Sequence, residues 1–221
     1  MRKTTLLLLC LLSMSALQAQ KQIKLFTNTQ SIDPKRYEGV RGTPMIYKDW
    51  KDAELIDTKD SLYTGLKLNY NGFEEGFEIQ RNSKEFIALN PKYYSQVMIV
   101  DENAPDGTAL FKKSVHSRFR DKFVQIIYEN EDLTLFKYIK VTKGEVTFQD
   151  VGETRTFENF KQAITYYILR DGKLKSVKLK KKSLLEALGS EKSLSSFIKK
   201  EKLKLSSDKD LHKLFAYYGS L

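Results

Sequence analysis

Histidine and cysteine, the residues most often found in metal sites and nucleophilic active sites, are scarce in this sequence. Among 221 residues there is one cysteine, Cys10, and there are two histidines, His116 and His212, far apart in the chain. A His-rich metal site or a His-based triad needs more such residues than this. Motifs for serine hydrolases, P-loops and dinucleotide binding are also missing. We therefore predict no catalytic residue, no metal ligand and no cofactor-binding residue.

Long apolar runs are missing too, except for residues 6–17. That run of about 12 residues is shorter than the roughly 20 that cross a bilayer as a helix. It follows two cations and precedes small residues ending at Ala19, an order typical of a secretory signal peptide. We expect residues 1–19 to be removed; an uncleaved anchor or a lipoprotein built on Cys10 are the alternatives. Removal takes away the only cysteine and so excludes disulfides and thiolate chemistry.

What remains is rich in strand signals. From Leu62 to Tyr70 apolar residues alternate with other residues, the pattern of a half-buried strand. Asn71-Gly72 and Asp171-Gly172 are dipeptides favoured in tight hairpin turns, although the first loop can also extend to Gly76. Residues 143–160 are expected to be a loop.

After residue 182 the apolar spacing changes to that of helices. Ser183-Leu184-Leu185-Glu186 matches a capping box, Gly189 is a suitable helix end, and later apolar residues recur three and four positions apart. The predicted class is mainly β (α+β): an antiparallel β-sandwich or partly open barrel, followed by a cluster of three short helices. The expected parts are an arm or linker at 20–42, a β-rich domain at 43–182 and a helical segment at 183–221 packed on it.

Charge is distributed unevenly. Between Gln20 and Gly172 there are 23 Lys and Arg against 23 Asp and Glu, whereas Lys173–Leu221 holds 13 Lys against 5 acidic residues. Lysine without arginine produces a general positive field rather than bidentate phosphate recognition. The candidate contacts with an anionic surface are Lys192, Lys199, Lys200, Lys202 and Lys204. Solubilisation of the helices is the competing interpretation.

The basic C-terminal end favours an anionic partner in the cell envelope, which is either a lipid or polysaccharide surface or an envelope protein. Nucleic acid is disfavoured by the export signal. No transmembrane segment is expected after cleavage of the signal peptide.

Three acidic residues lie near the first hairpin turn: Glu74, Glu75 and Glu78. Glycoside hydrolases use a pair of carboxylates, but that pair must be buried and set across a cleft. We therefore expect these three residues to solubilise the turn.

Several segments resemble a known group of proteins. They are Gly42-Thr43-Pro44, Asp49-Trp50, Leu68-Asn69-Tyr70-Asn71, Lys180-Lys181-Lys182-Ser183-Leu184-Leu185 and the ending Leu214-Phe215-Ala216-Tyr217-Tyr218-Gly219-Ser220-Leu221. Together they resemble small exported proteins of unknown function common in Bacteroidota. The resemblance implies a Gram-negative envelope location and brings no active site with it.

The sequence as a whole predicts an exported, periplasmic or extracellular protein that binds or scaffolds in the envelope and is non-enzymatic. A periplasmic hydrolase that uses carboxylates not identifiable in the sequence is the alternative. A buried carboxylate pair with shifted pKa values in a pocket would favour the hydrolase, and a shallow surface without such a pair would favour the binding protein.

Overall fold

The computed structural model describes residues 29–150, 152–189 and 191–221. The predicted signal peptide at 1–19 and the first part of the predicted arm at 20–42 lie outside the described residues. Of that arm, the described part runs across the molecule to Arg41, which pairs with Asn159 in a parallel bridge.

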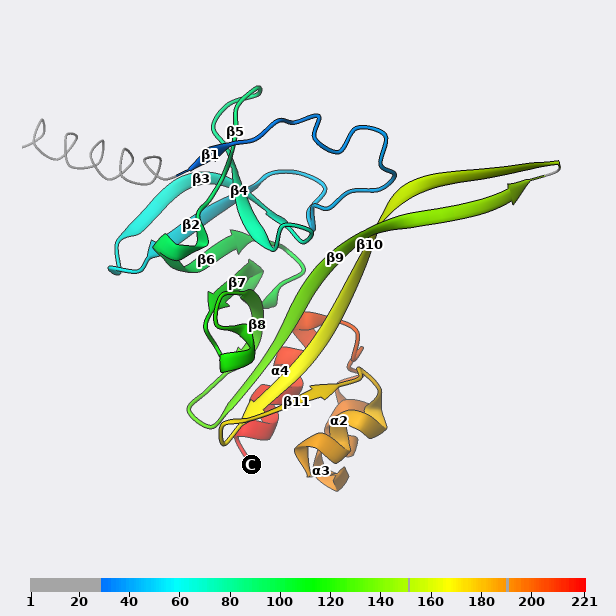
Figure 1. The fold of residues 1–221 in the computed structure, drawn as a ribbon. Helices are drawn as coiled ribbons and strands as arrows, with labels where there is room; N and C mark the ends of the chain where they lie inside the picture. The colour runs from blue at the N-terminus through cyan, green and yellow to red at the C-terminus, as the bar shows by residue number, and fades with distance from the viewer. Residues whose placement is uncertain (1–28, 151, 190) are drawn as a thin grey trace, which may run out of the picture.

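All strands belong to one antiparallel sheet, so the predicted mainly β class is confirmed (Figure 1). In chain order the strands are β1 (Gln30–Ser31), β2 (Lys51–Asp57), β3 (Leu62–Asn71), β4 (Gly76–Gln80), β5 (Phe86–Ala88), β6 (Tyr94–Val100), β7 (Thr108–Lys113), β8 (Phe123–Glu129), β9 (Leu133–Asp150), β10 (Glu153–Arg170) and β11 (Lys173–Val177). Their order across the sheet is β1-β5-β4-β3-β2-β6-β7-β8-β9-β10-β11. Short 3-10 turns are η1 (Pro91–Tyr93), η2 (Pro105–Gly107) and η3 (Ser117–Phe119).

The first part of the sheet curls around an aromatic core. Phe77 on β4 and Phe123 on β8 have ring centroids 5.1 Å apart, although β3, β2, β6 and β7 separate their strands in the sheet. Tyr70 and Phe111 fill the same cluster and are about 1% exposed. Such contact between distant strands requires strong curvature. Of the two expected arrangements, a sandwich and a partly open barrel, the curled single sheet matches the partly open barrel.

β9 and β10 form a hairpin that projects beyond the body (Figure 1). They pair without interruption from Leu133↔Arg170 to Asp150↔Glu153, so the prediction of a loop at 143–160 is wrong. Valine, threonine and phenylalanine make this segment suitable for a strand, but it lacks the buried alternation that identifies strands in a sequence. Its outer residues are exposed on both faces.

Three helices end the chain: α2 (Lys181–Leu188), α3 (Glu191–Lys200) and α4 (Asp208–Gly219). Their apolar residues form a second core with β8, β9, β10 and β11, in which Leu184, Leu194, Leu211, Leu214 and Phe215 are fully buried. The predicted helix start at Ser183 is wrong, because α2 begins at Lys181 with an extended Lys180 before it. Gly189 does end α2, with a φ of 77°, as a left-handed C-terminal glycine should.

The two predicted glycine turns differ. Asp171 and Gly172 have φ values of 51° and 68°, which confirms the tight turn. Gly72 is outside the left-handed region, and its turn extends over residues 72–75, between β3 and β4. Gly72 is instead required by a close approach, since a Cβ there would lie 2.7 Å from Cγ2 of Val141.

We expect Gly72→Val and Gly172→Val each to lower the free energy of unfolding by at least about 1 kcal/mol. The first clashes with a buried neighbour and the second imposes a left-handed φ on a β-branched residue. Gly144→Val is the matched control, because Gly144 lies in a strand with open space around it and an ordinary φ. Denaturant unfolding measures all three; midpoints of both test variants equal to that of the control would contradict these assignments.

Candidate functional site

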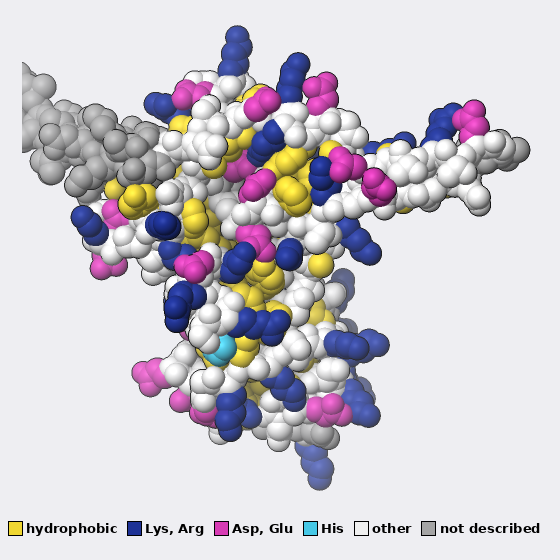
Figure 2. Space-filling view, viewed as in Figure 1, with side chains coloured by type: hydrophobic (Ala, Val, Ile, Leu, Met, Phe, Trp, Pro, Cys, Tyr) yellow, Lys and Arg dark blue, Asp and Glu magenta, His cyan; other side chains and the backbone are white. Residues whose placement is uncertain are grey.

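The predicted lysine contacts lie on α3 and the segment that follows it. Lys192, Lys199, Lys200, Lys202 and Lys204 are all exposed; we call these five residues the lysine face. Lys192 and Lys199 are close to two helical turns apart and therefore share a side of α3, away from the buried Leu194 and Ile198. Figure 2 shows Lys and Arg side chains over the lower part of the molecule, where the helices lie, and also over the body above it.

The lysine face has no acidic partner in the described part of the chain, where none of its ammonium groups forms an ion pair. Glu201, which lies between Lys200 and Lys202 in the sequence, is exposed and forms no ion pair among the described residues. Asp208 pairs with Lys137 at 2.6 Å, and Asp210 accepts from the backbone N–H of Lys204 at 2.8 Å. The five ammonium groups thus face solvent with one exposed carboxylate, that of Glu201, among them in the sequence.

Backbone geometry at the end of α3 holds Lys202 in place. The N–H of Leu203 donates to the carbonyl of Ile198 at 3.1 Å, and the N–H of Lys202 donates to that of Lys199 at 3.3 Å. This pair of bonds is a Schellman motif, which places Lys202 at its left-handed position with a φ of 52°. Glycine is the usual residue there because it has no Cβ. The chain therefore carries a cation at a position where glycine would fit with less strain.

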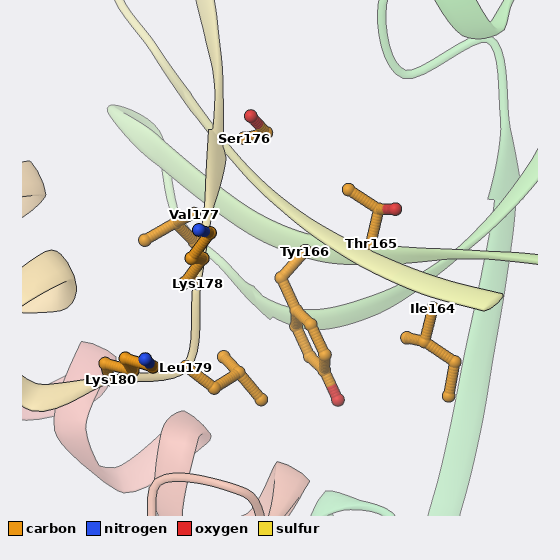
Figure 3. Close-up of a pocket in the computed structure, with 8 residues that line it drawn as sticks. All are labelled: Ile164, Thr165, Tyr166, Ser176, Val177, Lys178, Leu179 and Lys180. Atoms are coloured by element: carbon orange, nitrogen blue, oxygen red, sulfur yellow. The ribbon is translucent and has the colours of Figure 1, made fainter.

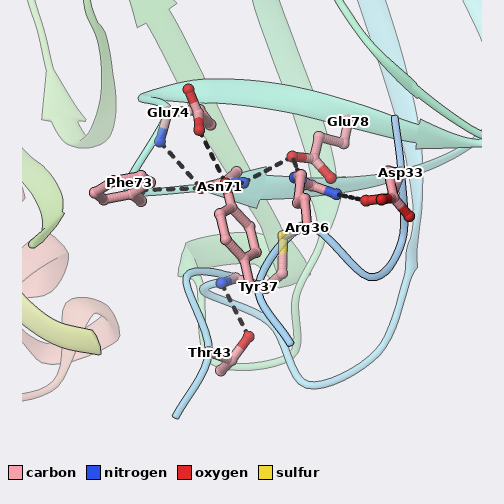
Figure 4. A network of polar contacts seen from close by, with 9 residues as sticks. Asp33, Arg36, Tyr37, Thr43, Asn71, Phe73, Glu74 and Glu78 are labelled. Carbon is pink, nitrogen blue, oxygen red and sulfur yellow. Dashed lines mark hydrogen bonds and ion pairs between the residues drawn. The ribbon is translucent and has the colours of Figure 1, made fainter. Parts of the chain in front are cut away.

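A second polar cluster joins the described arm to the first hairpin (Figure 4). Glu78 on β4 is 3% exposed and accepts from Arg36 Nη2 at 2.5 Å and from Asn71 Nδ2 at 2.7 Å. The Tyr37 hydroxyl donates to Glu74 at 2.9 Å. Burial alone would lower the pKa of Arg36, but Tyr37 and Glu78 raise it above its usual value; burial raises the pKa of Tyr37.

The turn at these carboxylates is more ordered than the sequence indicates. Glu75 pairs with Lys122 and accepts a hydrogen bond from the Tyr138 hydroxyl, and its side chain is 11% exposed. Glu75 and Glu78 are therefore not the solvated turn residues that we expected, because the arm and β9 cover them. Sequence reasoning missed Arg36 and Tyr37 here, since no local pattern signals a contact across some 40 residues.

A depression of about 530 Å³ borders this cluster, and its lining includes Arg36 and the three carboxylates of Glu74, Glu75 and Glu78. Glycoside hydrolysis needs one carboxyl that carries a proton. Arg36 and Asn71 both donate to Glu78, and Lys122 and Tyr138 contact Glu75, so both carboxylates are held by partners within the fold. This geometry fits a structural link between the arm and the sheet better than general acid catalysis.

Within residues 29–150, 152–189 and 191–221, no cluster of three or more His, Cys, Asp or Glu is arranged to bind a metal ion. No helix in that part of the chain is both long and apolar enough to cross a membrane. In comparisons with known proteins, no protein-family model, no curated protein and no solved structure matches the chain.

Proposed function

We propose that this chain is an exported, non-enzymatic protein of the cell envelope that docks on anionic lipid headgroups through the lysine face and so acts as a binding or scaffolding component. The observation that carries the proposal is the end of α3, where Lys202 occupies a left-handed position among exposed, unpaired lysines. Residues in sparsely populated conformations are often retained for function.

The chemistry of lysine supports a lipid surface as the partner. Each lysine near an anionic bilayer contributes about 1 kcal/mol, and the attraction needs no fixed geometry. Arginine, which suits bidentate recognition, is missing from the chain after Arg170. A surface of many headgroups therefore fits better than one specific phosphate ligand.

The proposal predicts that changing Lys199, Lys200, Lys202 and Lys204 together to Gln weakens binding to anionic vesicles by at least about tenfold. The measurement is co-sedimentation of the purified protein with phosphatidylglycerol-containing vesicles and with neutral phosphatidylcholine vesicles. Binding should also weaken between low and moderate salt, because screening shortens the reach of surface charges to about 10 Å at 0.1 M.

The matched control changes Lys48, Lys59, Lys84 and Lys92 to Gln, which removes the same charge from exposed positions outside the helical end. This control should keep most of the binding. Equal losses in both variants would mean that net charge alone acts, and binding that ignores salt or survives the first set of substitutions would contradict the proposal. Binding to anionic polysaccharide but not to vesicles would contradict lipid as the partner.

A further inference from the structure

The projecting part of the β9–β10 hairpin, residues 143–150 and 152–158, carries an apolar face in solvent; we call this part the hairpin arm. Val146 is directly opposite Phe157, and Phe148 is opposite Arg155, and residues paired in this way share a face of an antiparallel ribbon. Val146 is 41% and Phe148 57% exposed. The Arg41 guanidinium covers part of Phe157, 3.5 Å from its ring centroid. An exposed apolar cluster on a two-stranded ribbon is a poor arrangement for an isolated protein.

The edges of the hairpin arm are also open. β8 pairs with β9 only between Thr134 and Lys137, and β11 pairs with β10 only from Tyr166 to Arg170. In the described residues, backbone contacts close only the base of the hairpin arm: the N–H of Arg41 donates to the carbonyl of Glu158 at 2.9 Å, and the N–H of Val141 donates to that of Gly72 at 2.8 Å. Unpaired strand edges are templates for another chain.

Charge on the hairpin arm indicates the kind of partner. The arm holds four acidic residues against Lys143 and Arg155. Glu145 and Glu158 are directly opposite each other, and like charges in that position destabilise a ribbon. Lys143 pairs with Glu158 at 2.8 Å, whereas Glu145 has no ion pair among the described residues. Glu153 pairs with Arg155 at 2.9 Å, and Glu145 lies on the face of the ribbon opposite Val146 and Phe148. The hairpin arm still has a net excess of acidic residues, so a surface that combines lysines with apolar side chains would complement it.

Such a surface exists at the other end of the molecule. A groove of about 620 Å³ lies where β11 leaves β10 (Figure 3). Its apolar lining residues are Ile164, Tyr166, Val177 and Leu179, and its lysines are Lys178 and Lys180. Ile164 is 44% exposed, and both lysines are exposed. Because β11 pairs with β10 only up to Tyr166↔Val177, the edge of β10 on the β11 side is unpaired at Ile164, which pairs with Ile139 of β9 on its other side.

We propose that the hairpin arm of one copy docks in the apolar, lysine-lined groove of a second copy. Arm and groove complement each other in charge and in apolar character. Both include parts of the same continuous strand, β10, so a chain cannot reach its own groove with its own arm. The contact is thus head-to-tail, and repetition of it produces rings or filaments rather than a closed two-fold dimer.

Sedimentation velocity of the purified protein at increasing concentration tests the proposal. We expect species larger than a dimer to form, and Phe148→Ser to weaken self-association by about tenfold or more, as expected for one buried aromatic anchor. Val100→Ser is the matched control, because Val100 is also an exposed apolar strand residue, at 56%, far from both surfaces in the sheet order. A protein that stays monomeric at every concentration would overturn the proposal, and the hairpin arm would then need a different protein as its partner.

Charge reversal tests the pairing of the two surfaces independently of the lysine face. Glu145→Lys with Glu153→Lys gives one variant, and Lys178→Glu with Lys180→Glu gives the other; all four side chains are exposed. Each variant alone should lose self-association, and a mixture of the two should regain it, because each arm then meets a groove of opposite charge. Variants that associate as well as the unchanged protein, or a mixture that stays monomeric, would overturn the arm-in-groove contact.

Discussion

Replacing Arg36 by methionine should lower the free energy of unfolding by about 3–5 kcal/mol, because it leaves a buried carboxylate without its cation. Glu78 is 3% exposed, and Arg36 Nη2 lies 2.5 Å from its Oε1. Methionine keeps much of the length and apolar stem of arginine, so lost packing contributes little. Denaturant unfolding followed by circular dichroism measures the loss.

The control for this prediction removes both charges. Arg36→Met combined with Glu78→Gln should recover a large part of the loss, since a neutral amide can still accept from Asn71 and needs no cation. A single variant as stable as the unchanged protein would contradict the buried pair.

Replacing Phe215 by alanine should lower the free energy of unfolding by about 3–5 kcal/mol, the usual range for a large aromatic residue removed from a packed core. Phe215 on α4 is 0% exposed and packs with residues of β8 to β11 in the second core, including Tyr128, at a centroid distance of 6.2 Å. The cavity would lie between helix and sheet, where rigid strands limit relaxation.

Leu221→Ala is the matched control for Phe215, because Leu221 is also apolar but 64% exposed beyond the end of α4. It should change stability by less than about 0.5 kcal/mol. The single tryptophan, Trp50, stacks on Phe86 near the other end of the sheet. Its fluorescence therefore follows unfolding of that end, separately from the helices. A loss below about 1 kcal/mol for Phe215→Ala would contradict the role of this core in holding the helices.

Local sequence patterns correctly predicted the strands, turns and helices whose conformation depends on neighbouring residues. The alternation at Leu62–Tyr70 lies within β3, and Asp171-Gly172 forms the tight turn between β10 and β11. The three helices follow from apolar residues three and four positions apart, with only the start of α2 misplaced. In each case the neighbouring residues themselves determine the conformation.

Contacts between distant segments were not predictable in this way. Glu78 alternates with the inward-facing Phe77 and Ile79, so the sequence predicts an exposed side chain. In the structure, the N-terminal arm that ends at residue 42 covers Glu78 through Arg36. The outer halves of β9 and β10 are stabilised by pairing with each other and not by burial. Their valine, threonine and phenylalanine suit a strand, but nothing in the local sequence indicates that the two halves pair far from a core. The lysine face was predicted by charge count alone, whereas the left-handed position of Lys202 required the structure.

Export is the premise of the proposed function, and the N-terminus of the protein tests it most directly. N-terminal sequencing of the native protein from fractionated cells should give a sequence that begins near Gln20, in an envelope or extracellular fraction. Recovery of the chain with Met1 intact from the cytoplasmic fraction would contradict export, and with it the docking of the lysine face on the envelope.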